Sequence, residues 1–94
     1  MDYVYPAIFQ TCAKGGYAIS FPDLSGCYSQ GDTLPEAMRY AQWALAEFLE
    51  YLSDKAMPIP AASHIKEINV NNDEFVSLVY AKLNIETGAE AVIA

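Results

Sequence analysis

The sequence has 94 residues, of which 53% are hydrophobic and 18% charged, and its formal net charge is −7. This length fits one small domain, so we predict a single domain over residues 1–94. Twelve acidic residues against five basic ones argue against binding of DNA or RNA by this chain alone, because phosphate contacts need clustered Lys and Arg. An acidic surface is better suited to a basic protein partner.

Targeting and metal-binding signals are weak in this chain. Met1 is followed directly by a strand-like run, and no apolar stretch approaches the roughly 20 residues of a membrane span. We therefore expect a cytoplasmic protein without membrane contact, in which Cys12 and Cys27 are reduced. The two cysteines form no CxxC pattern, so we expect no metal and no cofactor.

The first third of the chain predicts strands. Residues 3–10, YVYPAIFQ, are rich in aromatic and β-branched types, and Pro6 among them suggests an edge position or a bulge. After a Gly-Gly turn, residues 17–21 alternate in polarity, and the pair predicts a β-hairpin. Residues 27–30 predict a short third strand.

Residues 34–55 predict a long helix. Thr33 and Glu36 match a capping box at its start, and Pro58 and Pro60 end it. Apolar residues recur at helical spacing along one stripe. They are Leu34, Ala37, Met38, Ala41, Leu45, Phe48, Leu49 and Leu52.

The remaining chain predicts a stiff connector over residues 57–64, an extended segment over 65–70 and a strand over 75–83. Residues 85–94 are ambiguous, and we predict no element for them. The order predicts an α+β fold, in which a three- to four-stranded, mainly antiparallel sheet carries one long helix on one face (β-β-β-α-β).

Candidate catalytic residues are few. Asp23, Asp32 and Glu36 are the acidic cluster near a strand end, and a metal-dependent nuclease would need such carboxylates to converge. A turn at Asp23 and capping at the helix start explain the same residues more simply. His64, the single histidine, lies in the connector without a catalytic motif. We therefore predict no catalytic residue, with Asp23 as a weak candidate.

The helix face opposite the apolar stripe is unusual for a solvated surface. It carries aromatic and acidic residues, which favour a protein contact as much as ordinary amphipathic packing. The predicted partner-binding residues are Tyr40, Trp43, Glu47, Glu50 and Tyr51.

Both faces of the first strand are apolar. One face would meet the helix, and a second copy of the chain is the simplest cover for the other. We therefore predict a homo-oligomer with Tyr3, Tyr5 and Phe9 in its interface.

The series YPAIF, then GGYAISFPDLSGCYSQGDTLPEA, then a helix with Ala41, Ala44 and Leu45, then PIPAAS resembles the HicB antitoxin family. The resemblance covers residues 3 to 63 closely and FVSLVYAKL more loosely. Ser25 departs from the family pattern, which usually has proline there.

This resemblance implies a partly degraded RNase H-like domain. It also implies a partner, the small basic toxin HicA, which is an mRNA interferase with a catalytic histidine that the antitoxin covers. Many family members carry a carboxy-terminal DNA-binding domain, but nothing after Leu83 is long or basic enough for one, so we expect no direct DNA binding.

The leading hypothesis is a non-enzymatic antitoxin-like protein that neutralises a HicA-type toxin by protein contact. The alternatives are a metal-dependent RNase H-like nuclease and a stand-alone RNA-associated protein, although the negative charge argues against RNA binding.

Overall fold

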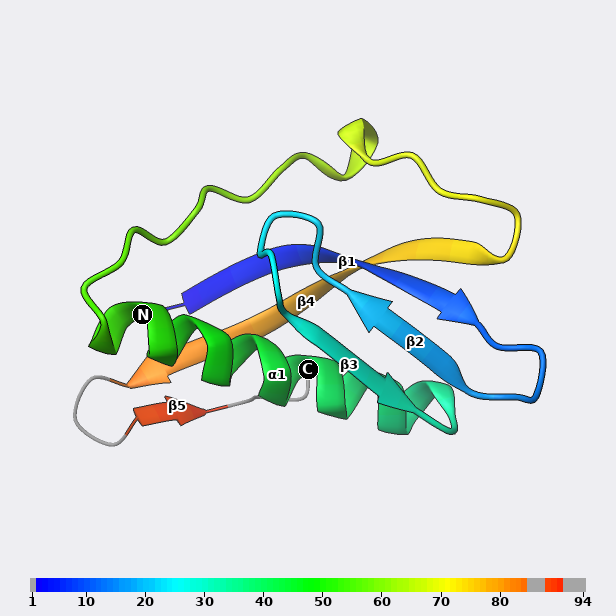
Figure 1. Cartoon of the computed structure of the whole chain (residues 1–94), viewed down its shortest axis with the longest axis horizontal. Helices are drawn as coiled ribbons and strands as arrows, with labels where there is room; N and C mark the ends of the chain where they lie inside the picture. Colours follow the sequence, from blue (N-terminus) through cyan, green and yellow to red (C-terminus); the bar gives the residue numbers. More distant parts are fainter. Residues whose placement is uncertain (1, 85–87, 91–94) are drawn as a thin grey trace.

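The computed structural model describes residues 2–84 and 88–90. It has three strands, one long helix, a connector with one 3-10 turn, and two more strands (Figure 1). Their bounds are β1 Asp2–Thr11, β2 Tyr17–Ser20, β3 Tyr28–Gly31, α1 Leu34–Asp54, η1 Ile65–Glu67, β4 Glu74–Asn84 and β5 Gly88–Glu90. The predicted fold class and element order are confirmed, and β5 adds one strand within the ambiguous stretch near the end of the chain. The extended segment predicted over 65–70 is wrong, because the chain turns into η1 there.

The sheet has the order β3-β2-β1-β4-β5, and every neighbouring pair is antiparallel. β2 pairs with β1 only from Ile8 onward, so the first half of β1 is an edge on that side. The hydrogen bond from Thr11 N to Asp73 O shows that Thr11 directs its backbone groups toward β4, and every second residue of β1 before it does the same. By that alternation the Pro6 nitrogen faces away from β4, which explains how a proline fits in this strand.

α1 begins as the sequence predicts. Thr33 is the N-cap residue, and its hydroxyl accepts a hydrogen bond from Glu36 N at 3.3 Å. Glu36 Oε1 accepts from Asp32 N at 3.1 Å, one residue earlier than in a standard capping box. The predicted stripe then lies against the sheet, with Ala37, Ala41, Leu45, Leu49 and Leu52 all buried.

The core lies between α1 and the inner face of the sheet. Tyr5 and Phe9 point into it and are only 2% and 0% exposed. These two residues therefore cannot form the predicted oligomer interface, because α1 covers their face of β1 within a single protomer. Tyr3 is partly buried and packs against the same core.

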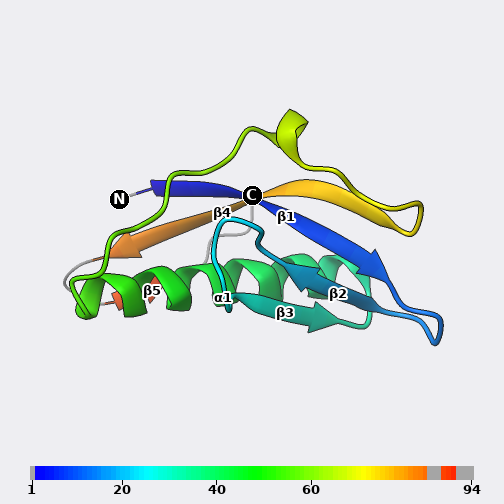
Figure 2. The same cartoon turned by 45° about the horizontal axis from the view of Figure 1, so that its top comes forward.

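The connector between α1 and β4 runs along the side of the sheet opposite α1 (Figures 1 and 2). In both views it runs on the side of the β1–β4 pair away from α1, and η1 lies against β4 (Figures 1 and 2). Pro6, on this outer face, is fully buried. On the same face Val4 is 45% exposed and Leu78, opposite Pro6 on β4, is 53% exposed, so the outer face of the sheet is only partly covered within the chain.

Hydrogen bonds at Pro60 and Ser63 tie the connector down. The Tyr5 hydroxyl donates to Pro60 O, and Ser63 donates to the Asp23 carboxylate in the β2–β3 loop. Over the part of the chain that the structure describes, no helix combines the length and the apolar character that a membrane crossing requires.

Candidate protein-binding surface

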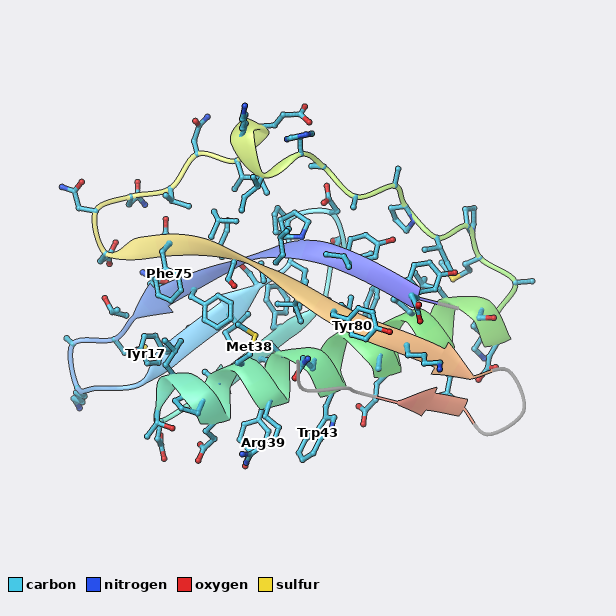
Figure 3. The ribbon with its side chains drawn as sticks, turned by 180° about the vertical axis from the view of Figure 1, so that it is seen from behind. Tyr17, Met38, Arg39, Trp43, Phe75 and Tyr80 are labelled. Carbon is cyan, nitrogen blue, oxygen red and sulfur yellow. The ribbon has the colours of Figure 1, made fainter. Side chains whose placement is uncertain are left out.

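The outward side of α1 exposes three aromatic rings. Tyr40, Trp43 and Tyr51 are 39%, 47% and 53% exposed. The rings of Tyr40 and Trp43 contact one another, with centroids 5.6 Å apart. Trp43 points away from the sheet beside Arg39 (Figure 3). Rings of this size on a solvated helix provide a ready protein contact, since aromatic residues are enriched in protein interfaces.

Carboxylates surround these rings. Glu47 is exposed and Glu50 is half-buried on the same side of the helix, and Glu36 lies one turn before Tyr40. We call this set the acidic-aromatic face of α1. It consists of Glu36, Tyr40, Trp43, Glu47, Glu50 and Tyr51. Its negative charge suits a partner that presents Lys and Arg.

The structure thus brings together all five predicted partner-binding residues on one side of one helix. Helical periodicity is sufficient to place them, because positions outside the apolar stripe must face away from the core. Their role in binding stays a prediction.

Two hollows border this face where it meets β3. One, of about 280 Å³, has Glu36 and Tyr40 on α1 and Gln30, Gly31 and Asp32 at the end of β3 among its lining residues. The other, of about 270 Å³, lies at the start of β3. Its lining includes Tyr28, Ala44, Glu47 and Phe48. The acidic-aromatic face therefore continues onto the margin of the sheet.

Sequence reasoning missed this margin. Tyr28 is 69% exposed at the start of β3, the highest exposure among the large hydrophobic side chains described. β3 reads YSQG and holds neither proline nor lysine, the residues that commonly protect an edge strand. The absence of these residues is a sequence signal for an unprotected strand, but only the strand order shows that β3 lies at the edge of the sheet.

Asp23 has a structural role in this fold. Its Oδ2 accepts from Ser63 N at 2.8 Å, and its Oδ1 accepts from the Ser63 hydroxyl. Asp23 follows β2 and Asp32 follows β3, and these strands are antiparallel, so the two carboxylates lie at opposite ends of the hairpin. Within the described residues no three His, Cys, Asp or Glu side chains converge on a metal position. The acidic cluster of the nuclease alternative is therefore not assembled.

The other candidate groups are dispersed. His64 is exposed in the connector, where its backbone N–H donates to Glu67 Oε1 at 2.9 Å. Both cysteines are free thiols, Cys12 on the surface and Cys27 buried. Burial raises the pKa of the Cys27 thiol to about 11, so it stays protonated at neutral pH and is a poor nucleophile.

Comparison with known proteins agrees with this geometry. Residues 5–91 match the family model described as the HicB-like antitoxin of bacterial toxin–antitoxin systems. The chain is 38% identical over 56 residues to antitoxin HicB 1 of Photorhabdus laumondii, covering 60% of this chain and 36% of that protein. It is 30% identical over 74 residues to antitoxin HicB of Escherichia coli K12, covering 79% and 51%.

The fold also matches a solved toxin–antitoxin complex from Streptococcus pneumoniae, with a TM-score of 0.80 and 18% identity over 100% of this chain and 81% of that one. The chain spans about a third to a half of the two curated antitoxins above. The match to the family model covers nearly all of its length. This chain therefore belongs to the HicB-like antitoxin family.

Proposed function

We propose that this chain is a non-enzymatic antitoxin, which binds a small basic HicA-type toxin through the acidic-aromatic face of α1 and so blocks cleavage of mRNA. The observation that carries the proposal is the exposed cluster of Tyr40, Trp43 and Tyr51 among carboxylates, in a chain of the HicB-like family. One structural neighbour of this fold is a complex of HicA3 with HicB3.

Charge and shape support the same partner. The net charge of −7 attracts a basic protein over long range, and the aromatic rings supply apolar area at the contact. No specific observation favours the nuclease or RNA-binding alternatives. Asp23, the weak catalytic candidate, is engaged by Ser63, and the negative charge disfavours RNA. We place this binding in the cytoplasm, where both cysteines remain thiols.

Co-expression with a neighbouring reading frame that encodes a short basic protein tests the proposal. We expect the two proteins to co-purify, and we expect this chain to stop RNA cleavage by the toxin at equimolar concentration. Failure to bind that protein in low-salt buffer, or unabated cleavage in its presence, would contradict the proposal.

Matched variants locate the contact. Trp43→Ala and Glu47→Lys should each weaken binding by roughly tenfold or more, because they remove a central ring or reverse a charge. Glu67→Lys makes the same charge reversal on the exposed connector and should change affinity little. If Glu47→Lys and Glu67→Lys weaken toxin binding equally, the loss comes from the change in net charge, and the acidic-aromatic face is not the contact.

The homo-oligomer stays part of the proposal, with a different contact. The connector leaves Val4 and Leu78 on the outer sheet face 45% and 53% exposed. Leu78→Asp should shift the chain to a monomer in light scattering, while Met57→Asp, at an exposed residue just after α1, should not. A monomeric wild-type chain at high concentration would exclude self-association.

A further inference from the structure

The free edge of β3 offers unpaired backbone groups to a partner. The hydrogen bond from Phe21 N to Cys27 O continues the β2–β3 ladder. In an antiparallel ladder, every second residue directs its N–H and C=O groups toward the paired strand. Ser29 and Gly31 therefore direct their N–H and C=O groups toward β2. The same groups of Tyr28 and Gln30 point the other way, and no strand lies beyond β3 in the part of the chain that the structure describes.

This edge is accessible. Tyr28 and Gln30 are both exposed, and β3 lies at the margin of the sheet in front of α1 (Figure 1). At the opposite side of the sheet, by contrast, Gln42 Nε2 on α1 donates to Tyr80 O on β4 at 3.4 Å. Helix α1 thus satisfies a backbone group of β4 but leaves the outer edge of β3 available.

Charge decides which strand fits this edge. Carboxylates flank it at both ends, with Asp32 and Glu36 lining one hollow and Glu47 the other. Pairing of β3 with the β3 of a second copy would bring two such acidic sets together, which costs free energy. An extended segment rich in Lys and Arg would instead place its side chains against these carboxylates.

We propose that the edge of β3 takes up an extended basic strand of the partner, which extends the sheet through the backbone groups of Tyr28 and Gln30. This mode of binding rests on the proposed antitoxin function and specifies how the partner is recognised. Main-chain hydrogen bonds would supply affinity, and the acidic flanks would select a basic sequence.

Amide hydrogen exchange on the unmodified complex tests the proposal. The probe is a HicA-type toxin, made inactive by replacement of its histidine. We expect the Tyr28 and Gln30 amides to exchange fast in the free chain and to be protected in the complex. The Ser29 and Gly31 amides, already paired with β2, should be protected in both states and serve as internal controls.

A pair of variants gives a second test. Gln30→Pro removes the outward N–H and fills its place with a ring, which an edge strand tolerates. It should weaken toxin binding by roughly tenfold or more, while Gln30→Ala, which keeps the N–H, should change it by less than about threefold. The melting temperature of each variant checks that the fold is intact.

The outcomes separate this proposal from the antitoxin function itself. If the toxin binds but the Tyr28 and Gln30 amides stay unprotected, strand addition is excluded and the antitoxin function stands. If the toxin does not bind at all, the antitoxin function fails first. Protection of these amides that rises with the concentration of the free chain would assign the edge to a second copy and overturn the proposal.

Discussion

Gly31 illustrates how a single residue fixes the contact between β3 and α1. A Cβ atom at this position would lie 2.5 Å from both the Cα and the N of Ala37. Backbone atoms in the first turn of a helix cannot move aside easily, so only glycine fits this approach. Gly31, the last residue of β3, is therefore required by the close packing of this strand against α1.

Gly31→Ala should destabilise the chain by about 3 kcal/mol through this overlap. Urea unfolding measures the change, and Gln30→Ala, at the exposed neighbour, serves as the control. An unchanged unfolding midpoint for Gly31→Ala would show that the approach of β3 to α1 is looser than the structure indicates.

Cys27 is the second residue whose surroundings determine its chemistry. Its thiol is buried, and its Sγ lies 3.7 Å from Ala44 O. Because burial raises its pKa to about 11, the native thiol stays protonated where the unfolded thiol already ionises. Its contribution to stability is complete below the unfolded pKa and is lost as the pH rises toward 11.

Iodoacetamide at pH 8 should therefore modify Cys12 quickly and leave Cys27 unmodified in the native chain, as mass spectrometry would report. In urea both cysteines should react. Equal labelling of the two thiols under native conditions would mean that the segment around Cys27 opens readily.

Among the elements, α1 follows closely from its local sequence. Its predicted bounds differ from the observed Leu34–Asp54 by one residue. The N-cap, the helical spacing of the apolar residues and the prolines after the helix are local features. They can therefore be recognised in the sequence without knowledge of the fold. The connector is different, because its position depends on residues far away in sequence.

The contact between Asp23 and Ser63 holds the connector to the β2–β3 loop. Asp23→Ala should lower stability by about 2 kcal/mol, because it removes the acceptor for both the Ser63 N–H and the hydroxyl. Ser63→Ala removes only the hydroxyl and should cost about half as much. Thermal unfolding of both variants and of the double variant measures the coupling, and additive effects would show that the two residues act independently.

At the scale of the whole molecule, the charge distribution sets how partners approach. The acidic-aromatic face adds to a net charge of −7, so association with a basic toxin should be fast in low salt. Raising NaCl from about 50 to about 500 mM should lower the association rate by roughly tenfold and the dissociation rate much less. Stopped-flow mixing measures both, and a salt-independent association rate would argue against steering.

Sequence by itself determined the elements that rest on short-range physics. The hairpin, the long helix and the aromatic side of that helix all follow from periodicity and caps, and the family follows from the ordered motif around FPDLSGC. Each of these features depends on residues that are close together along the chain, so the order of residue types is enough to specify it.

Only the tertiary structure decided which apolar surfaces stay open. In the sequence Tyr5 and Phe9 are large aromatic residues of the kind that interfaces use, but in the fold they are buried under α1. On the outer face Pro6 is buried within the protomer while Val4 and Leu78 stay exposed, and the strand order leaves β3 as an edge with outward backbone groups. Burial and edge position depend on which distant segments meet, and residue type along the chain does not record that.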